Sequence, residues 1–80
     1  MENDITDFKT ILQEIDEADN TIALEVIVEG SALQRDLKID YSVSYTEQAK
    51  KFKDSKNPFE VELSKILLIA DEKFSQLENG

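Results

Sequence analysis

The chain has 80 residues, with 18 Asp and Glu against 9 Lys and Arg, and a formal net charge of -9. It contains no Cys, no His and no Trp, which excludes a disulfide framework, a thiolate zinc site, a Cys nucleophile and a His general base. The length predicts one domain spanning residues 1–80, and a hydrophobic content of 40% is too high for a disordered acidic tail.

The acidic charge is concentrated near the start of the chain. Residues 1–34 hold nine acids and one base, whereas residues 35–56 hold four acids and six bases. A negative field of this kind repels nucleic acid and anionic lipid and attracts basic protein surfaces. We therefore expect a protein partner with a basic surface, and neither direct nucleic-acid binding nor membrane binding.

No segment reads as a membrane or secretion signal. The longest uninterrupted apolar run, Ile66 to Ala70, is far shorter than the ~20 residues that a membrane span needs. The acidic start of the chain also lacks the basic-then-apolar order of a secretory signal. A cytoplasmic protein is the resulting expectation.

The first predicted element is an amphipathic helix over residues 4–18. Its apolar residues recur at spacings of three and four, which places them on one helical face: Ile5, Phe8, Ile11, Leu12, Ile15 and Ala18. Asn3 is the expected N-cap, and Asp4 and Asp7 fall in the first turn, where the helix dipole favours negative charge.

Residues 21–29 and 37–45 alternate apolar and polar side chains and are rich in β-branched residues. We read them as two half-buried strands joined by a polar loop that opens at Gly30 and Ser31. Two such runs joined by a short connection predict an antiparallel hairpin.

Two further helices are expected after the hairpin. Thr46 is the predicted N-cap of a short helix over residues 47–54. Asn57 and Pro58 predict the start of a longer helix that ends near residue 77, with Glu60 as a capping-box partner. The alternation over residues 59–63 leaves an edge strand open as an alternative for its first turns. The predicted fold is therefore a small α+β domain of order αββαα, with the hairpin packed against helices.

A candidate partner-binding surface is the acidic first half of the chain. Five carboxylates stand on the predicted outward faces of the first helix and first strand: Asp7, Glu14, Glu17, Glu25 and Glu29. Carboxylates at such intervals imitate the phosphate spacing of a nucleic acid and suit the basic channel of a nucleic-acid-binding protein. The competing interpretation is that they only keep a small domain in solution.

Two other clusters attract weaker hypotheses. Lysines gather at positions 50, 51, 53 and 56, preceded by Arg35 and Lys38, which suggests a phosphate contact. Without aromatic neighbours beyond Phe52, they are better explained as an offset to the acidic helices, or as partners of Glu47 and Asp54 on their own helix. Val61, Leu68 and Ile69 leave the apolar face of the last helix, which suggests a homodimer formed through that helix.

No catalytic constellation is apparent. The pairs Asp4 with Asp7 and Asp16 with Asp19 lack the loop spacing of a calcium site, and no glycine-rich phosphate loop occurs. We expect no enzyme activity, no cofactor and no metal. The function that these observations favour is a non-enzymatic acidic protein-binding module, an inhibitor of a nucleic-acid-handling protein in the manner of phage anti-CRISPR or anti-restriction proteins. The alternative is a self-associating assembly protein.

Overall fold

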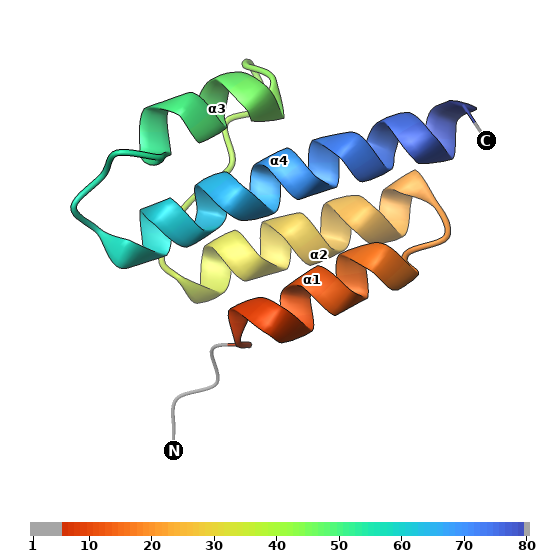
Figure 1. The fold of residues 1–80 in the computed structure, drawn as a ribbon, viewed down its shortest axis with the longest axis horizontal. Helices are drawn as coiled ribbons and strands as arrows, with labels where there is room; N and C mark the ends of the chain where they lie inside the picture. Colours follow the sequence, from red (N-terminus) through yellow and green to blue (C-terminus); the bar gives the residue numbers. More distant parts are fainter. Residues whose placement is uncertain (1–5, 80) are drawn as a thin grey trace.

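The computed structural model describes residues 6–79, and this part of the chain folds into four α-helices. The helices are α1 (Phe8–Glu17), α2 (Thr21–Gln34), α3 (Tyr45–Phe52) and α4 (Pro58–Asn79). Helices α1, α2 and α4 lie side by side, and α3 packs on α4 at the edge of this layer (Figure 1). The long α4 contacts each of the other three helices, so it forms the centre of the domain.

The predicted hairpin is wrong, and with it the α+β class and the order αββαα. Residues 21–29 belong to α2, and no strand occurs between residues 6 and 79. Read at helical spacing, Leu24, Val28 and Ala32 recur every four residues, and all three are fully buried. Asn20 caps the helix, since its side-chain oxygen accepts a hydrogen bond from Ala23 N at 2.8 Å.

The predicted loop at Gly30 and Ser31 is an interior turn of α2. Ser31 is buried and donates its hydroxyl hydrogen bond to Val28 O at 2.8 Å, which satisfies the hydroxyl within the helix. The helix ends three residues later, at Gln34, in a Schellman arrangement. Leu37 N donates to Ala32 O at 2.8 Å while Asp36 takes the left-handed conformation with φ 60°.

The second predicted strand is irregular for most of its length. Without a partner strand, its backbone forms hydrogen bonds with a side chain instead. Asp40 N donates to Gln48 Oε1 at 2.7 Å, and Gln48 Nε2 donates to Asp40 O at 2.7 Å. Leu37 and Ile39 still pack against the core, so part of the alternation reflects burial without a sheet.

Helix α1 is shorter than predicted. Asp7 is its N-cap rather than a first-turn residue, with Oδ1 accepting from Thr10 N at 2.8 Å. The expected cap at Asn3 lies outside the described residues. The predicted apolar face is correct where it is described, with Ile11 and Ile15 both 1% exposed.

The last two helices are confirmed, with small differences in their bounds: α3 begins and ends two residues earlier than predicted, and α4 continues to Asn79. Ser44, not Thr46, caps α3, accepting from Glu47 N at 3.1 Å. Asn57 caps α4 as predicted, accepting from Phe59 N at 2.9 Å, and residues 59–63 are helical, so the edge-strand alternative is wrong. Glu60 does not close a capping box directly, because its carboxylate accepts from the Ser55 hydroxyl, which itself accepts from Asn57 N.

The core lies where α1, α2 and α4 meet. Its largest fully buried side chains are Ile11, Ile15, Leu24, Val28, Leu63, Ile66 and Leu67. Small buried residues, including Ala32, Ala49 and Ala70, complete the core. Among the helices of residues 6–79, none combines the length and the apolar character needed to cross a bilayer.

Candidate functional site

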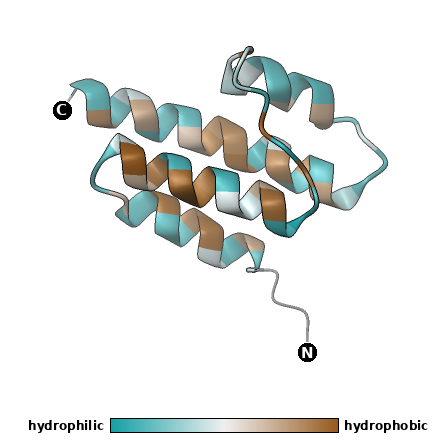
Figure 2. Cartoon of the chain, turned by 180° about the vertical axis from the view of Figure 1, so that it is seen from behind, coloured by the Kyte–Doolittle hydropathy of each residue, from teal (hydrophilic) through white to brown (hydrophobic). Residues whose placement is uncertain are grey.

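The outward face of α2 carries a stripe of exposed apolar side chains. Ile22 is 73% exposed, Val26 64% and Leu33 60%. Spacings of four and seven residues place the three on one line along the helix, opposite the buried Leu24 and Val28. We call these three residues the outer stripe. Figure 2 shows α2 as the helix with apolar colouring over most of its length. A helix that is apolar on two opposite faces is typical of burial on both sides, which the described chain does not provide.

Carboxylates lie along both flanks of the outer stripe. On the α1 side, Glu14 and Val26 line a shallow hollow of about 190 Å³ between the two helices. On the other side, Glu29 and Leu33 line a hollow of about 200 Å³ with residues 37–39. Glu25 lies one helical turn before Glu29 and shares that flank. We call Glu14, Glu25 and Glu29 the flanking carboxylates.

The other two predicted acidic residues lie apart from these hollows. Asp7 is committed to capping α1, and the hydrogen bond from the Thr10 backbone holds the pKa of Asp7 below its usual value. Glu17 is exposed at the end of α1, where it accepts a hydrogen bond from Gln13 Nε2 at 3.2 Å. The structure thus places three of the five predicted carboxylates beside the outer stripe and the other two near the ends of α1.

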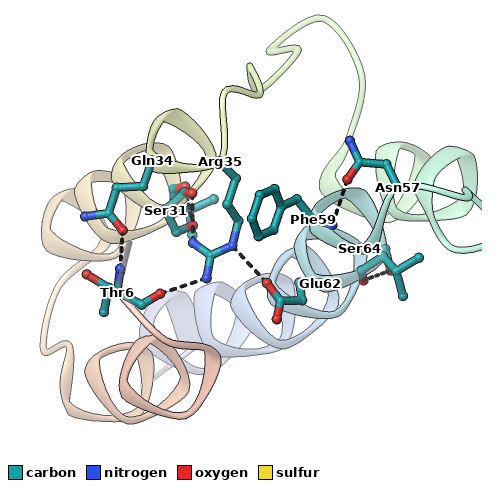
Figure 3. A network of polar contacts seen from close by, with 10 residues as sticks. Thr6, Ser31, Gln34, Arg35, Asn57, Phe59, Glu62 and Ser64 are labelled. Carbon is teal, nitrogen blue, oxygen red and sulfur yellow. Dashed lines mark hydrogen bonds and ion pairs between the residues drawn. The ribbon is translucent and has the colours of Figure 1, made fainter. Parts of the chain in front are cut away.

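Arg35 fixes the end of α2 against its neighbours. Its side chain is 1% exposed and donates from Nε to Glu62 Oε1 on α4 at 3.0 Å (Figure 3). Nη1 donates to Ser31 O at 3.1 Å and Nη2 to Thr6 O at 2.8 Å, and the guanidinium lies 6.0 Å from the Phe59 ring centroid. A planar guanidinium that reaches three acceptors in this way orients α2 on α4 and on the segment before α1. Arg35 is therefore structural, unlike the lysines with which the sequence groups it.

Those lysines remain in solvent on the far side of α4. Lys50, Lys51, Lys53 and Lys56 are all exposed, in or just after α3. The expected pairing within the helix is seen once, between Lys50 Nζ and Glu47 Oε1 at 3.9 Å. At this distance and exposure the pair contributes little to stability.

The three residues predicted for self-association all belong to α4 and differ in exposure. Leu68 is 49% exposed and Ile69 38% exposed, whereas Val61 is half-buried. Ile69 lines a hollow with Leu12 between α1 and α4, and the adjacent Leu68 points about 100° away around the helix.

A fourth hollow lies beyond Glu25, between α2, the segment before α3, and α4. It is open to solvent, has a volume of about 380 Å³ and is lined by Glu25, Tyr41, Val43, Ser44, Tyr45, Asp71, Phe74 and Glu78. Burial raises the pKa of Tyr45 to about 12, and repulsion from ionised Tyr41 and from the carboxylates of Glu25, Glu29 and Asp71 adds to this shift. Sequence reasoning missed the outer stripe and this hollow, because both depend on α2 being a helix.

No group of three or more carboxylates within residues 6–79 is arranged to hold a metal ion. Comparison with family models, with curated proteins and with solved structures finds no match to this chain. The geometry of α2 and its flanks is accordingly the basis for assigning a role.

Proposed function

We propose that the chain is a non-enzymatic protein-binding module that docks a basic, amphipathic segment of its partner on the outer face of α2. The observation that carries this proposal is the outer stripe, three large apolar side chains that are each at least 60% exposed, with carboxylates on both flanks. A partner with an apolar ridge bordered by Lys or Arg matches both features at once.

The two features contribute differently to binding. Burying the outer stripe supplies affinity, because fully burying a Val, Leu or Ile side chain is worth about 1.5–3 kcal/mol. The flanking carboxylates, exposed at the margin, mainly accelerate encounter and select the partner's charge. The proposal therefore assigns affinity to the apolar residues and specificity to Glu14, Glu25 and Glu29.

A second copy of the chain fits this face less well than a basic partner. Pairing two α2 helices would bring the flanking carboxylates of both copies together in a protein of net charge -9. Repulsion between like charges disfavours that arrangement.

Inhibition of a nucleic-acid-handling protein is the narrower form of the proposal. If the partner's basic segment is also its nucleic-acid contact, docking on α2 displaces the nucleic acid, as an anti-CRISPR or anti-restriction protein of a phage would. The support is the net charge of residues 1–34, nine acids against one base. Nucleic acid should then compete with the chain for the partner.

The test is affinity capture with matched variants. Wild type, Val26→Asp and the double variant Glu25→Lys/Glu29→Lys serve as baits in lysate of the organism that encodes the chain. Leu68→Asp, a charge placed at a similarly exposed apolar residue of α4, is the control. We expect one basic protein to be captured by wild type and Leu68→Asp and lost with the other two baits.

Salt separates the two contributions. The affinity of the captured complex should fall as ionic strength rises. Residual binding from the buried apolar side chains should persist at salt concentrations where charge interactions are screened. Capture that survives Val26→Asp and the charge reversal, or that is lost only with Leu68→Asp, contradicts the proposal.

A further inference from the structure

The hollow between α2, residues 41–45 and α4 combines aromatic and acidic walls. Three rings line it, from Tyr41, Tyr45 and Phe74, and three carboxylates, from Glu25, Asp71 and Glu78. The centroids of the Tyr45 and Phe74 rings lie 5.5 Å apart with the ring planes tilted by 58°, so the two rings pack against each other and form the aromatic wall of the hollow. Tyr41, which also lines the hollow, is 63% exposed.

Within residues 6–79, no Lys or Arg lines this hollow or pairs with its carboxylates. The ion pairs found within residues 6–79 join Arg35 to Glu62 and Lys50 to Glu47, both outside it. The described residues that line the hollow include neither Lys nor Arg. Asp71 receives one neutral hydrogen bond, from the Thr46 hydroxyl at 3.3 Å. The three carboxylates of the hollow therefore form no ion pair within residues 6–79.

We infer that this hollow binds one guanidinium group, the side chain of an arginine carried by the docked partner. Aromatic faces attract cations through their quadrupole, and the attraction is larger where water is partly excluded. A guanidinium also stacks flat on a ring and donates in pairs to carboxylates, which a compact ammonium does less well. The walls of this open hollow present both aromatic rings and carboxylates.

The hollow continues the docking face. Glu25 belongs both to the flank of the outer stripe and to the wall of the hollow, so an arginine beside the partner's apolar ridge reaches it without leaving α2. The origin of the guanidinium rests on the proposed function, whereas the capacity of the hollow to bind a guanidinium does not.

The chain provides its own probe for the experiment. It has two tyrosines and no tryptophan, and both tyrosines line the hollow, so intrinsic tyrosine fluorescence reports on this site. N-acetyl-arginine amide is titrated into the full chain at constant ionic strength. N-acetyl-citrulline amide, of nearly the same shape but neutral, is the matched ligand.

We expect a saturable change with the arginine compound, with a dissociation constant of roughly 1–10 mM, and none with citrulline. Glu25→Gln and Asp71→Asn should each weaken binding by roughly three- to tenfold. Glu14→Gln, which removes a carboxylate on the other flank of the outer stripe, should leave it unchanged. Equal responses to the two ligands, the absence of saturation, or equal weakening by Glu14→Gln would overturn the inference.

A failure of the arginine-binding inference can be distinguished from a failure of the proposed docking function. Val26→Asp should abolish partner docking and leave arginine binding intact, because Val26 does not line this hollow. If the amide does not bind while docking persists, only the role of the hollow falls. If the amide binds while no basic partner depends on the outer stripe, only the docking proposal falls.

Discussion

Helices α1 and α2 pack on the same core, yet they present different surfaces to solvent. On the face opposite the buried Ile11 and Ile15, α1 exposes polar side chains such as Gln13 and Asp16. Behind the buried Leu24, α2 exposes the outer stripe. The inner faces are equivalent in burial, so folding accounts for both of them. The apolar outer face of α2 is unexplained by folding, and this difference directs the functional proposal to α2.

The largest expected effect is the difference in unfolding free energy between substitutions on the two faces of α2. Leu24→Ala should lower the free energy of unfolding by about 2–5 kcal/mol, because it removes buried methyl groups and leaves a cavity. Val26→Ala, two residues away on the outer stripe, should change it by no more than about 0.5 kcal/mol. Urea denaturation followed by circular dichroism measures both. Similar losses in the two variants would mean that Val26 supports the fold, and the comparison between α1 and α2 would fail.

The next effect concerns what holds α2 in place. Arg35→Met should cost about 1–3 kcal/mol, since it leaves the carbonyls of Ser31 and Thr6 and the Glu62 carboxylate without their donor. Lys38→Met removes an exposed base three residues later and should have little effect. Chemical denaturation of both variants decides the point. Equal stabilities would show that the network in Figure 3 does not anchor α2.

The outer stripe also explains why the sequence misleads at α2. In residues 21–29, apolar side chains recur at every second position (Ile22, Leu24, Val26 and Val28), which matches the two-residue period of a strand. A helix that is apolar on opposite faces has no single apolar stripe, so the period of 3.6 is hidden. Helix α1, which has a polar outer face, was predicted correctly as a helix from the same kind of pattern. The signal that points to a helix at α2 is the cap at Asn20, followed by helix-compatible residues through Gln34.

The candidate site was predictable only in part. The acidic charge of residues 1–34 is visible in the sequence, and three of its carboxylates flank the outer stripe. Their placement on two sides of an apolar line depends on the helical register of α2. The hollow beyond Glu25 depends in addition on the return of residues 41–45 to α4, a long-range contact that no local pattern encodes.

The smallest expected effect tests the helical nature of the outward face itself. Gly30 lies inside α2 without a positive φ, and a Cβ added there would meet no atom within 4 Å. Gly30→Ala should therefore raise the free energy of unfolding by about 0.5–1 kcal/mol, because Ala loses less backbone freedom than Gly on entering a helix. Gln13→Ala on the outward face of α1 should change it less, since Gln already favours helix. Had Gly30 adopted the positive φ of a tight hairpin turn, Ala at this position would destabilise the fold. The sign of the change thus decides between a continuous α2 and an interrupted one, and with it whether Val26 and Leu33 share one face.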